Sequence, residues 1–174
     1  VLASLPFLYW FLFRVPFRMK RLLAFLDPFG DPLNSSYHIR QSLMAVGNGG
    51  VLGLGLGESK AKLFFLPESN TDFIFAVIGE ELGLWGTLLV LTLFAILCWR
   101  GLRAALRAPD LFGSYLALGL TLMIVLQALI NMSVTLSLVP TKGITLPFIS
   151  KGGSSLLMSA ISAGLLLNVA QEGQ

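Results

Sequence analysis

The chain has 174 residues, of which 55% are hydrophobic and only 12% are charged, with a net charge of +3. Soluble domains carry about 25% charged residues, so this composition argues against an ordinary soluble enzyme, and the high apolar content excludes a disordered chain. The one cysteine, Cys98, allows no internal disulfide, and the one histidine is His38. A histidine-rich metal site and a Ser-His-Asp triad are equally disfavoured.

Four apolar stretches predict membrane-spanning helices, each of which needs about 20 mainly apolar residues. Residues 1–13 are apolar but short, so we expect the end of a truncated span in a piece of a longer protein. The second span, over 73–99, is interrupted by two glutamates, whereas the spans over 111–139 and 156–171 carry no formal charge. None shows barrel-type alternation, so the prediction is an all-α membrane fold.

Two connections separate these spans. The long one, residues 14–72, contains prolines and a glycine-rich stretch over 47–57, and it predicts a structured loop with interfacial helices. The glycines do not match the GxGxxG nucleotide motif and favour a flexible or tightly packed turn. The short connection, 100–110, carries three arginines. A raw count of basic residues places the long loop in the cytoplasm. The density of arginines instead favours the short connection as the cytoplasmic one, so the orientation stays open.

Asp72 lies where the polar end of the long loop meets the second span. Partial desolvation at this border would raise the pKa of the carboxyl group, which suits a proton acceptor. However, Ser69-x-x-Asp72 also matches a capping box, and acidic residues favour helix N-termini in any case. The residues alone favour capping and leave the catalytic interpretation open.

The pair Glu80-Glu81 lies one to two turns deeper in the same span. Acidic residues inside a membrane are costly and suggest function. The alternative is a structural anchor to a neighbouring helix. Eight residues of helix extend about 12 Å, so Asp72 and Glu80 are not expected to form a close carboxylate pair.

Residues 140–155 precede the last span. Two prolines break the helix there, and Gly152-Gly153 permits a tight turn, after which Ser154-Ser155 opens the last helix. Free N–H groups at a helix N-terminus, together with Lys142, suit a phosphate group. The alternative is a re-entrant turn with close helix packing, and the segment is not a Walker A loop.

These motifs together resemble the C-terminal part of the SEDS family (shape, elongation, division and sporulation), bacterial membrane glycosyltransferases that polymerise peptidoglycan from lipid II. The resemblance covers about residues 21–168, and Lys142 makes it closer to the division and sporulation branches than to the elongation branch. Lys151 and Asn70 depart from the family, which commonly has tyrosine and histidine there. The matching residues are Tyr37, Gln41-Ser42-Leu43-Met44-Ala45, Gly53-Leu54-Gly55-Leu56-Gly57, Leu66-Pro67-Glu68, Thr71-Asp72-Phe73-Ile74-Phe75-Ala76, Gly79-Glu80-Glu81-Leu82-Gly83 and the segment 140–155.

The resemblance implies an all-α polytopic membrane protein. In it, this chain forms the C-terminal four transmembrane segments of a ten-span SEDS fold, the first one truncated, with a broken last helix. The loop 14–72 and the re-entrant turn 140–155 are then extracytoplasmic, and the loop 100–110 is cytoplasmic. This orientation is the opposite of the one that the raw count of basic residues favours. The outward basic charge suits lipid II, whose pyrophosphate is anionic.

The resemblance also implies that Asp72 is the essential acid, and a general base fits its place in the sequence. The candidates for binding the substrate pyrophosphate are Lys142 and the turn Gly152, Gly153, Ser154, Ser155, with Lys62 and Glu68 as outer candidates. No metal site is visible in the sequence, although a divalent cation could assist. We expect the fragment alone to be inactive, because the cavity of the family also needs the preceding spans.

The implied partners are lipid II, a class B penicillin-binding transpeptidase, other septal division proteins and membrane lipids. The basic cluster Arg14, Arg18, Lys20 and Arg21 is the candidate for lipid headgroups, and nothing suggests nucleic acid. The implied location is the bacterial cytoplasmic membrane, at the division septum. Two alternatives stay open: a lipid II flippase, because broken helices and buried acids also describe transporters, and a septal scaffold protein.

Overall fold

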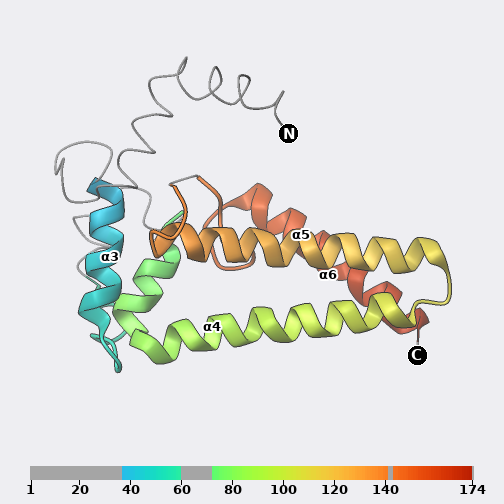
Figure 1. Cartoon of the computed structure of the whole chain (residues 1–174), viewed down its shortest axis with the longest axis horizontal. Helices are drawn as coiled ribbons and strands as arrows, with labels where there is room; N and C mark the ends of the chain where they lie inside the picture. Colours follow the sequence, from blue (N-terminus) through green and yellow to red (C-terminus); the bar gives the residue numbers. More distant parts are fainter. Residues whose placement is uncertain (1–36, 60–71, 141–142, 174) are drawn as a thin grey trace, which may run out of the picture.

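The computed structural model describes residues 37–59, 72–140 and 143–173, and all regular structure within these ranges is helical (Figure 1). The helices are α3 (Tyr37–Gly49), α4 (Ile74–Arg107), α5 (Leu111–Thr135) and α6 (Gly153–Glu172). The last three are long and apolar enough to cross a membrane. The predicted all-α membrane fold is therefore confirmed for the described residues, while the expected truncated span over 1–13 lies outside them.

Helix α4 continues to Arg107, eight residues beyond the predicted end of the span at Trp99. Alanine, leucine and arginine, which dominate this extension, are good helix formers. The helix ends only at Ala108, which has ψ 136° because it precedes Pro109. Asp110 then caps α5 by accepting a hydrogen bond from the Gly113 N–H (3.2 Å). The predicted connection 100–110 is thus helical over most of its length.

Helices α4 and α5 run side by side, and α6 lies against both (Figure 1). Small residues allow their close approach: a Cβ atom added at Gly101 of α4 would lie 2.1 Å from the Thr121 hydroxyl of α5. Their shared core contains Phe94, Ile124 and Ala128. Such small-residue contacts are typical of helices that associate within a membrane, where hydrophobic burial gives little drive.

Helix α4 is kinked at Gly83, which has φ 64° and ψ −153° inside the helix. The kink frees backbone groups that a straight helix would pair, and the glycine-rich segment 50–55 pairs them instead. Leu84 N–H donates to the Gly50 carbonyl, and the carbonyls of Glu80 and Glu81 accept from Leu54 and Gly55, all at 3.0 Å. Since unpaired backbone groups are costly within a membrane, the segment and the kink stabilise each other.

Glycines are required at this contact because the two backbones touch. A Cβ atom at Gly83 would lie 2.4 Å from the Gly53 nitrogen, and one at Gly53 would lie 2.2 Å from the Glu81 carbonyl oxygen. Of the two interpretations of the glycine-rich stretch, the tightly packed turn is the one observed. Below it, the Glu80 carboxylate is 1% exposed and accepts a hydrogen bond from the Ser59 hydroxyl (2.5 Å). Glu80 thus anchors this segment to α4.

Candidate active site

Asp72 lies in a half-buried turn directly before α4. The helix begins at Ile74, after the N-cap residue Phe73, and no acidic residue lies in its first turn. A capping box built on Ser69 would place Asp72 three residues inside the helix. Ser69 lies outside the described residues, so the capping interpretation stays a prediction; Asp72 itself lies two residues before the first residue of α4.

The Asp72 carboxylate faces the irregular segment 143–152 that precedes α6. A Cβ atom added at Gly143 would lie 2.9 Å from Asp72 Oδ2, which is closer than real Cβ contacts allow. The absence of a side chain at this position lets the segment approach the acid. Lys142, the preceding residue, lies outside the described residues.

Asn131 of α5 joins the turn of Asp72 to this segment. Its side-chain Nδ2 donates to the Asp72 carbonyl oxygen (2.8 Å) and to the Ile144 carbonyl oxygen (2.6 Å). The side chain is 1% exposed, and its Oδ1 atom has no hydrogen-bond partner among the described residues. One buried amide therefore fixes the spacing of two loops that are 72 residues apart in the sequence.

A second amide, Gln127, lies one turn away on the same helix. Its Nε2 donates to the Thr145 carbonyl oxygen (3.0 Å) and approaches the Thr145 hydroxyl (3.3 Å). That hydroxyl is 2.7 Å from the Ser155 hydroxyl in the first turn of α6. The segment 143–152 is thus tied to α5 on one side and to α6 on the other.

The middle of the segment is a tight turn closed by Ser150. The Leu146 N–H donates to the Ser150 hydroxyl (2.7 Å), and the Ser150 N–H donates back to the Leu146 carbonyl (3.0 Å). Within the turn, Phe148 has φ 65°, which is an outlier for a bulky residue. Strained residues of this kind persist where the surroundings determine the backbone, and here both ends of the turn are held by hydrogen bonds.

The N-terminus of α6 is open at the same end of the molecule. Its N-cap residue, Gly152, provides no side-chain cap, and both Gly153 and Ser154 are exposed. The backbone N–H groups of the first helical turn have no intrahelical acceptor and carry partial positive charge. An anionic group can be received there.

The structure therefore brings together two of the three predicted motifs. Asp72 and the turn at Gly152–Ser155 are connected through Asn131, Thr145 and their backbone partners, whereas Glu80 lies under the glycine-rich segment. Three predicted site residues, Lys142, Lys62 and Glu68, lie outside the described residues. Among those described, no three His, Cys, Asp or Glu side chains come together as metal ligands, so help from a divalent cation stays a prediction.

Gln127 and Asn131 were not among the predicted site residues, because in the sequence they stand only as polar residues inside the span over 111–139. The usable signal is their spacing: two amides four residues apart lie on the same face of a helix, in a run of 31 residues without a charge. Polar side chains inside a membrane normally find a hydrogen-bond partner on another element. Their partners, the two loops, could not be read from the spacing.

Comparison with known proteins gives consistent matches. The whole chain, residues 1–174, matches the FtsW/RodA/SpoVE family, described as cell cycle proteins. It is 52% identical to a probable peptidoglycan glycosyltransferase FtsW of Geobacter metallireducens, over 97% of this chain and 45% of that protein. It is 54% identical to the stage V sporulation protein E of Bacillus subtilis, over 90% of this chain and 43% of that protein.

A solved structure matches as well. One chain of a peptidoglycan synthase complex, described as coordinating polymerization and crosslinking, superposes with a TM-score of 0.69 and 31% identity, covering 91% of this chain and 43% of that one. The present chain thus spans less than half the length of these relatives.

Proposed function

Because this chain belongs to the FtsW/RodA/SpoVE family, we propose that it is the C-terminal part of a peptidoglycan glycosyltransferase that polymerises lipid II during cell division. The observation that carries the proposal is the position of Asp72, whose carboxylate lies outside α4 and against the backbone of Gly143. A carboxylate held against the segment that leads to an open helix N-terminus would provide a base and an anion site at the same end of the molecule. Both are needed for the transfer of a sugar from a pyrophosphate donor.

In the proposed step, the 4-hydroxyl group of the acceptor GlcNAc attacks C1 of the donor MurNAc. A new glycosidic C–O bond forms, and the bond between C1 and the pyrophosphate oxygen breaks. An alcohol is a weak nucleophile until its proton is removed, and Asp72 accepts that proton as general base. Asn131 acts as a positioning residue, because it fixes the backbone of Asp72 against the segment 143–152.

The leaving group is undecaprenyl pyrophosphate, on which negative charge develops. Lys142 and the N–H groups of the turn Gly152, Gly153, Ser154 and Ser155 compensate this charge. The hydroxyl pair of Thr145 and Ser155 holds this turn beside the segment 143–152, which follows Lys142 in the sequence. Lys62 and Glu68 are further contacts for the donor, and a divalent cation could share the charge.

The proposal fixes an orientation in the bacterial cytoplasmic membrane. Asp72 and the segment 143–152 face outward, where the sugar of lipid II is used, and the connection after Arg107 faces the cytoplasm. The natural partner is a class B penicillin-binding transpeptidase that crosslinks the new strands, together with other proteins of the division septum. The match to a synthase complex for polymerization and crosslinking supports this partner class.

The test is lipid II polymerisation by the full-length protein with its transpeptidase partner. Asp72→Asn keeps the size of the side chain but removes the base, and we expect polymer formation to fall at least about 100-fold, the contribution typical of general base catalysis. Thermal unfolding should stay near that of the wild type. Glu58→Gln, which removes an exposed carboxylate of the long loop, is the matched control and should retain activity.

Polymer yield at the wild-type level in Asp72→Asn would reject the assignment of the base. A flippase would move lipid II between leaflets without releasing undecaprenyl pyrophosphate, so release of that product separates the two functions. A scaffold would support division with Asp72 replaced by alanine, and the glycosyltransferase would not.

A further inference from the structure

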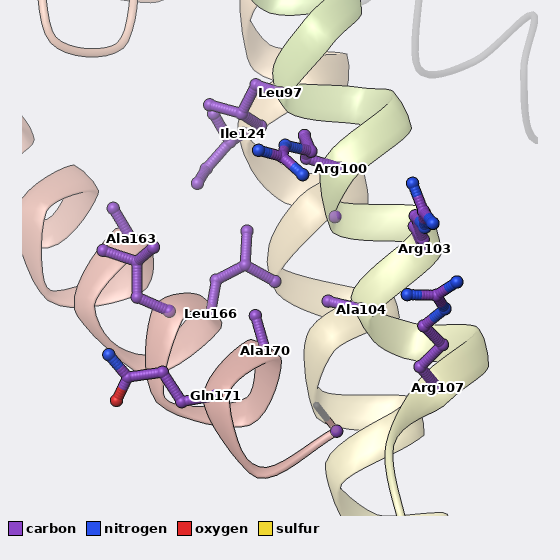
Figure 2. Close-up of a pocket in the computed structure, with 13 residues that line it drawn as sticks. Leu97, Arg100, Arg103, Ala104, Arg107, Ile124, Ala163, Leu166, Ala170 and Gln171 are labelled. Atoms are coloured by element: carbon purple, nitrogen blue, oxygen red, sulfur yellow. The ribbon is translucent and has the colours of Figure 1, made fainter.

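A pocket of about 630 Å³ opens at the end of α4 opposite to Asp72, between α4, α5 and α6 (Figure 2). It takes no part in the proposed site. It is of the size typical of small-molecule and lipid sites. Its walls come from the last turns of α4 and α6 and from Ile124 of α5.

One side of the pocket is cationic. Arg100, Arg103 and Arg107 follow one another along α4 and all line it, with Gln171 on α6 as a further polar group. Spacings of three and four residues place the three arginines on one face of the helix, and the side chain of Arg100 turns toward Ile124 (Figure 2). In the described part of the chain, the carboxylates at this end are those of Asp110 and Glu172, and neither lines the pocket. The positive charge of the pocket thus favours an anionic ligand.

The other side of the pocket is hydrocarbon. Leu97, Ile124 and Leu166 form apolar walls, and small side chains at Ala104 and Ala163 keep the space open. Figure 2 shows Leu166 of α6 lying across from Ala104 of α4. An inorganic anion would make no contact with these apolar walls, so we expect a ligand that carries an apolar chain beside its charged group.

The pocket lies at the level where a membrane meets water. The 16 uncharged residues from Leu84 to Trp99 extend about 24 Å as a helix, close to the hydrocarbon thickness of a bilayer. Trp99 and Tyr115 are 59% and 70% exposed, as aromatic residues of the interfacial belt are. The Arg103 guanidinium lies 5.7 Å above the Trp99 ring. The arginines therefore begin at the headgroup region.

We propose that this pocket binds an anionic phospholipid of the inner leaflet. The headgroup phosphate is held by Arg100, Arg103 and Arg107, and an acyl chain follows the apolar wall between α4 and α6. Arginine suits this task because its planar group forms paired hydrogen bonds with phosphate oxygens. Basic pockets between transmembrane helices on the cytoplasmic side recognise lipid headgroups in this way.

The test uses the full-length protein in detergent, titrated with phosphatidylglycerol or with phosphatidylcholine and followed by native mass spectrometry. We expect tighter retention of phosphatidylglycerol. In the variant R100Q/R103Q/R107Q, the apparent Kd for phosphatidylglycerol should rise about five-fold per arginine removed, with no change for phosphatidylcholine. Lys151→Gln removes an exposed cation at the opposite end and is the matched control, for which we expect no change.

A second variant separates the pocket from a general surface charge. Ala163→Phe fills the apolar side while all three arginines remain, and we expect about tenfold weaker retention of phosphatidylglycerol. Equal retention of the two lipids, or unchanged retention in either variant, would overturn the proposal. Unchanged retention in Ala163→Phe alone is the result expected if the arginines only attract lipids diffusely, and unchanged retention in both variants is the result expected if another part of the longer protein occupies the pocket.

Discussion

At the scale of single residues, one buried amide, Asn131, joins the two loops of the candidate site. The two hydrogen bonds from Asn131 end on carbonyl oxygens of the Asp72 turn and of Ile144. They do not change the chemistry of the Asp72 carboxylate, but they set where it stands relative to the segment 143–152. A displacement of about 1 Å at a reacting group can reduce a rate about 100-fold, so in the proposed enzyme the geometry of these two bonds would affect turnover.

Replacing Asn131 tests this positioning role. In Asn131→Asp the side chain keeps its size, but an oxygen replaces the donor that faces two carbonyl groups. We expect kcat for lipid II polymerisation to fall about 10- to 100-fold, with a smaller change in KM, because the base is misplaced rather than the substrate site removed. Kinetics are measured on the full-length protein, well below its unfolding temperature.

Asn168→Asp, on the exposed face of α6, is the matched control and should behave as the wild type. Asn131→Asp is expected to lower stability as well, by about 1–3 kcal/mol for polar groups left unpaired. If kcat were unchanged while the protein remained folded, Asn131 would be a structural residue alone. If KM alone rose, its role would be in substrate binding.

At the scale of the elements, the positions of the spans were predictable from the sequence, whereas the end and the kink of α4 were not. The three spans were predictable because length and apolarity are local properties of the sequence. The end of α4 at Arg107 was missed, since charge marks where a helix leaves the membrane and not where it stops. The kink at Gly83 depends on backbone groups of Gly50 and Leu54, about 30 residues earlier, and no local pattern reports such a contact.

The contact between the kink and the glycine-rich segment predicts that a methyl group added at Gly83 strongly destabilises the folded protein. Gly83→Ala would place a side chain in a strained backbone region and 2.4 Å from the Gly53 nitrogen. Together, strain and overpacking should lower the free energy of unfolding by about 2–4 kcal/mol. The measurement is thermal or denaturant unfolding of the full-length protein in detergent.

Gly119→Ala provides the control for this substitution. Gly119 lies within α5, and an added Cβ atom meets nothing within 4 Å. Alanine favours a helix by about 1 kcal/mol over glycine, so this variant should be neutral or slightly more stable. Equal stability of the two alanine variants would mean that the segment 50–55 does not hold the kink.

At the scale of the whole molecule, α4 separates two ends of different chemistry. Asp72, Gly143 and the start of α6 lie at one end, and the arginine-lined pocket lies at the other. Simple counting of basic residues leaves the orientation of these ends unresolved, because the long loop is rich in cations too. Under the proposed function, the cations of the long loop would suit an anionic substrate, and those of the pocket would suit an anionic lipid. The proposal would thus account for positive charge on both sides of the membrane.

Orientation is testable by cysteine labelling in intact cells. In a full-length protein whose native cysteines, including Cys98, are replaced by serine, single cysteines are introduced at Glu58 or at Pro109, both exposed. A membrane-impermeant maleimide should label Glu58→Cys from outside the cell and Pro109→Cys only after the membrane is opened. The reason is that α4 crosses the membrane between them. The reverse pattern would place Asp72 at the cytoplasmic face, away from the sugar acceptor. It would contradict both the proposed glycosyl transfer and the proposed lipid site in the inner leaflet.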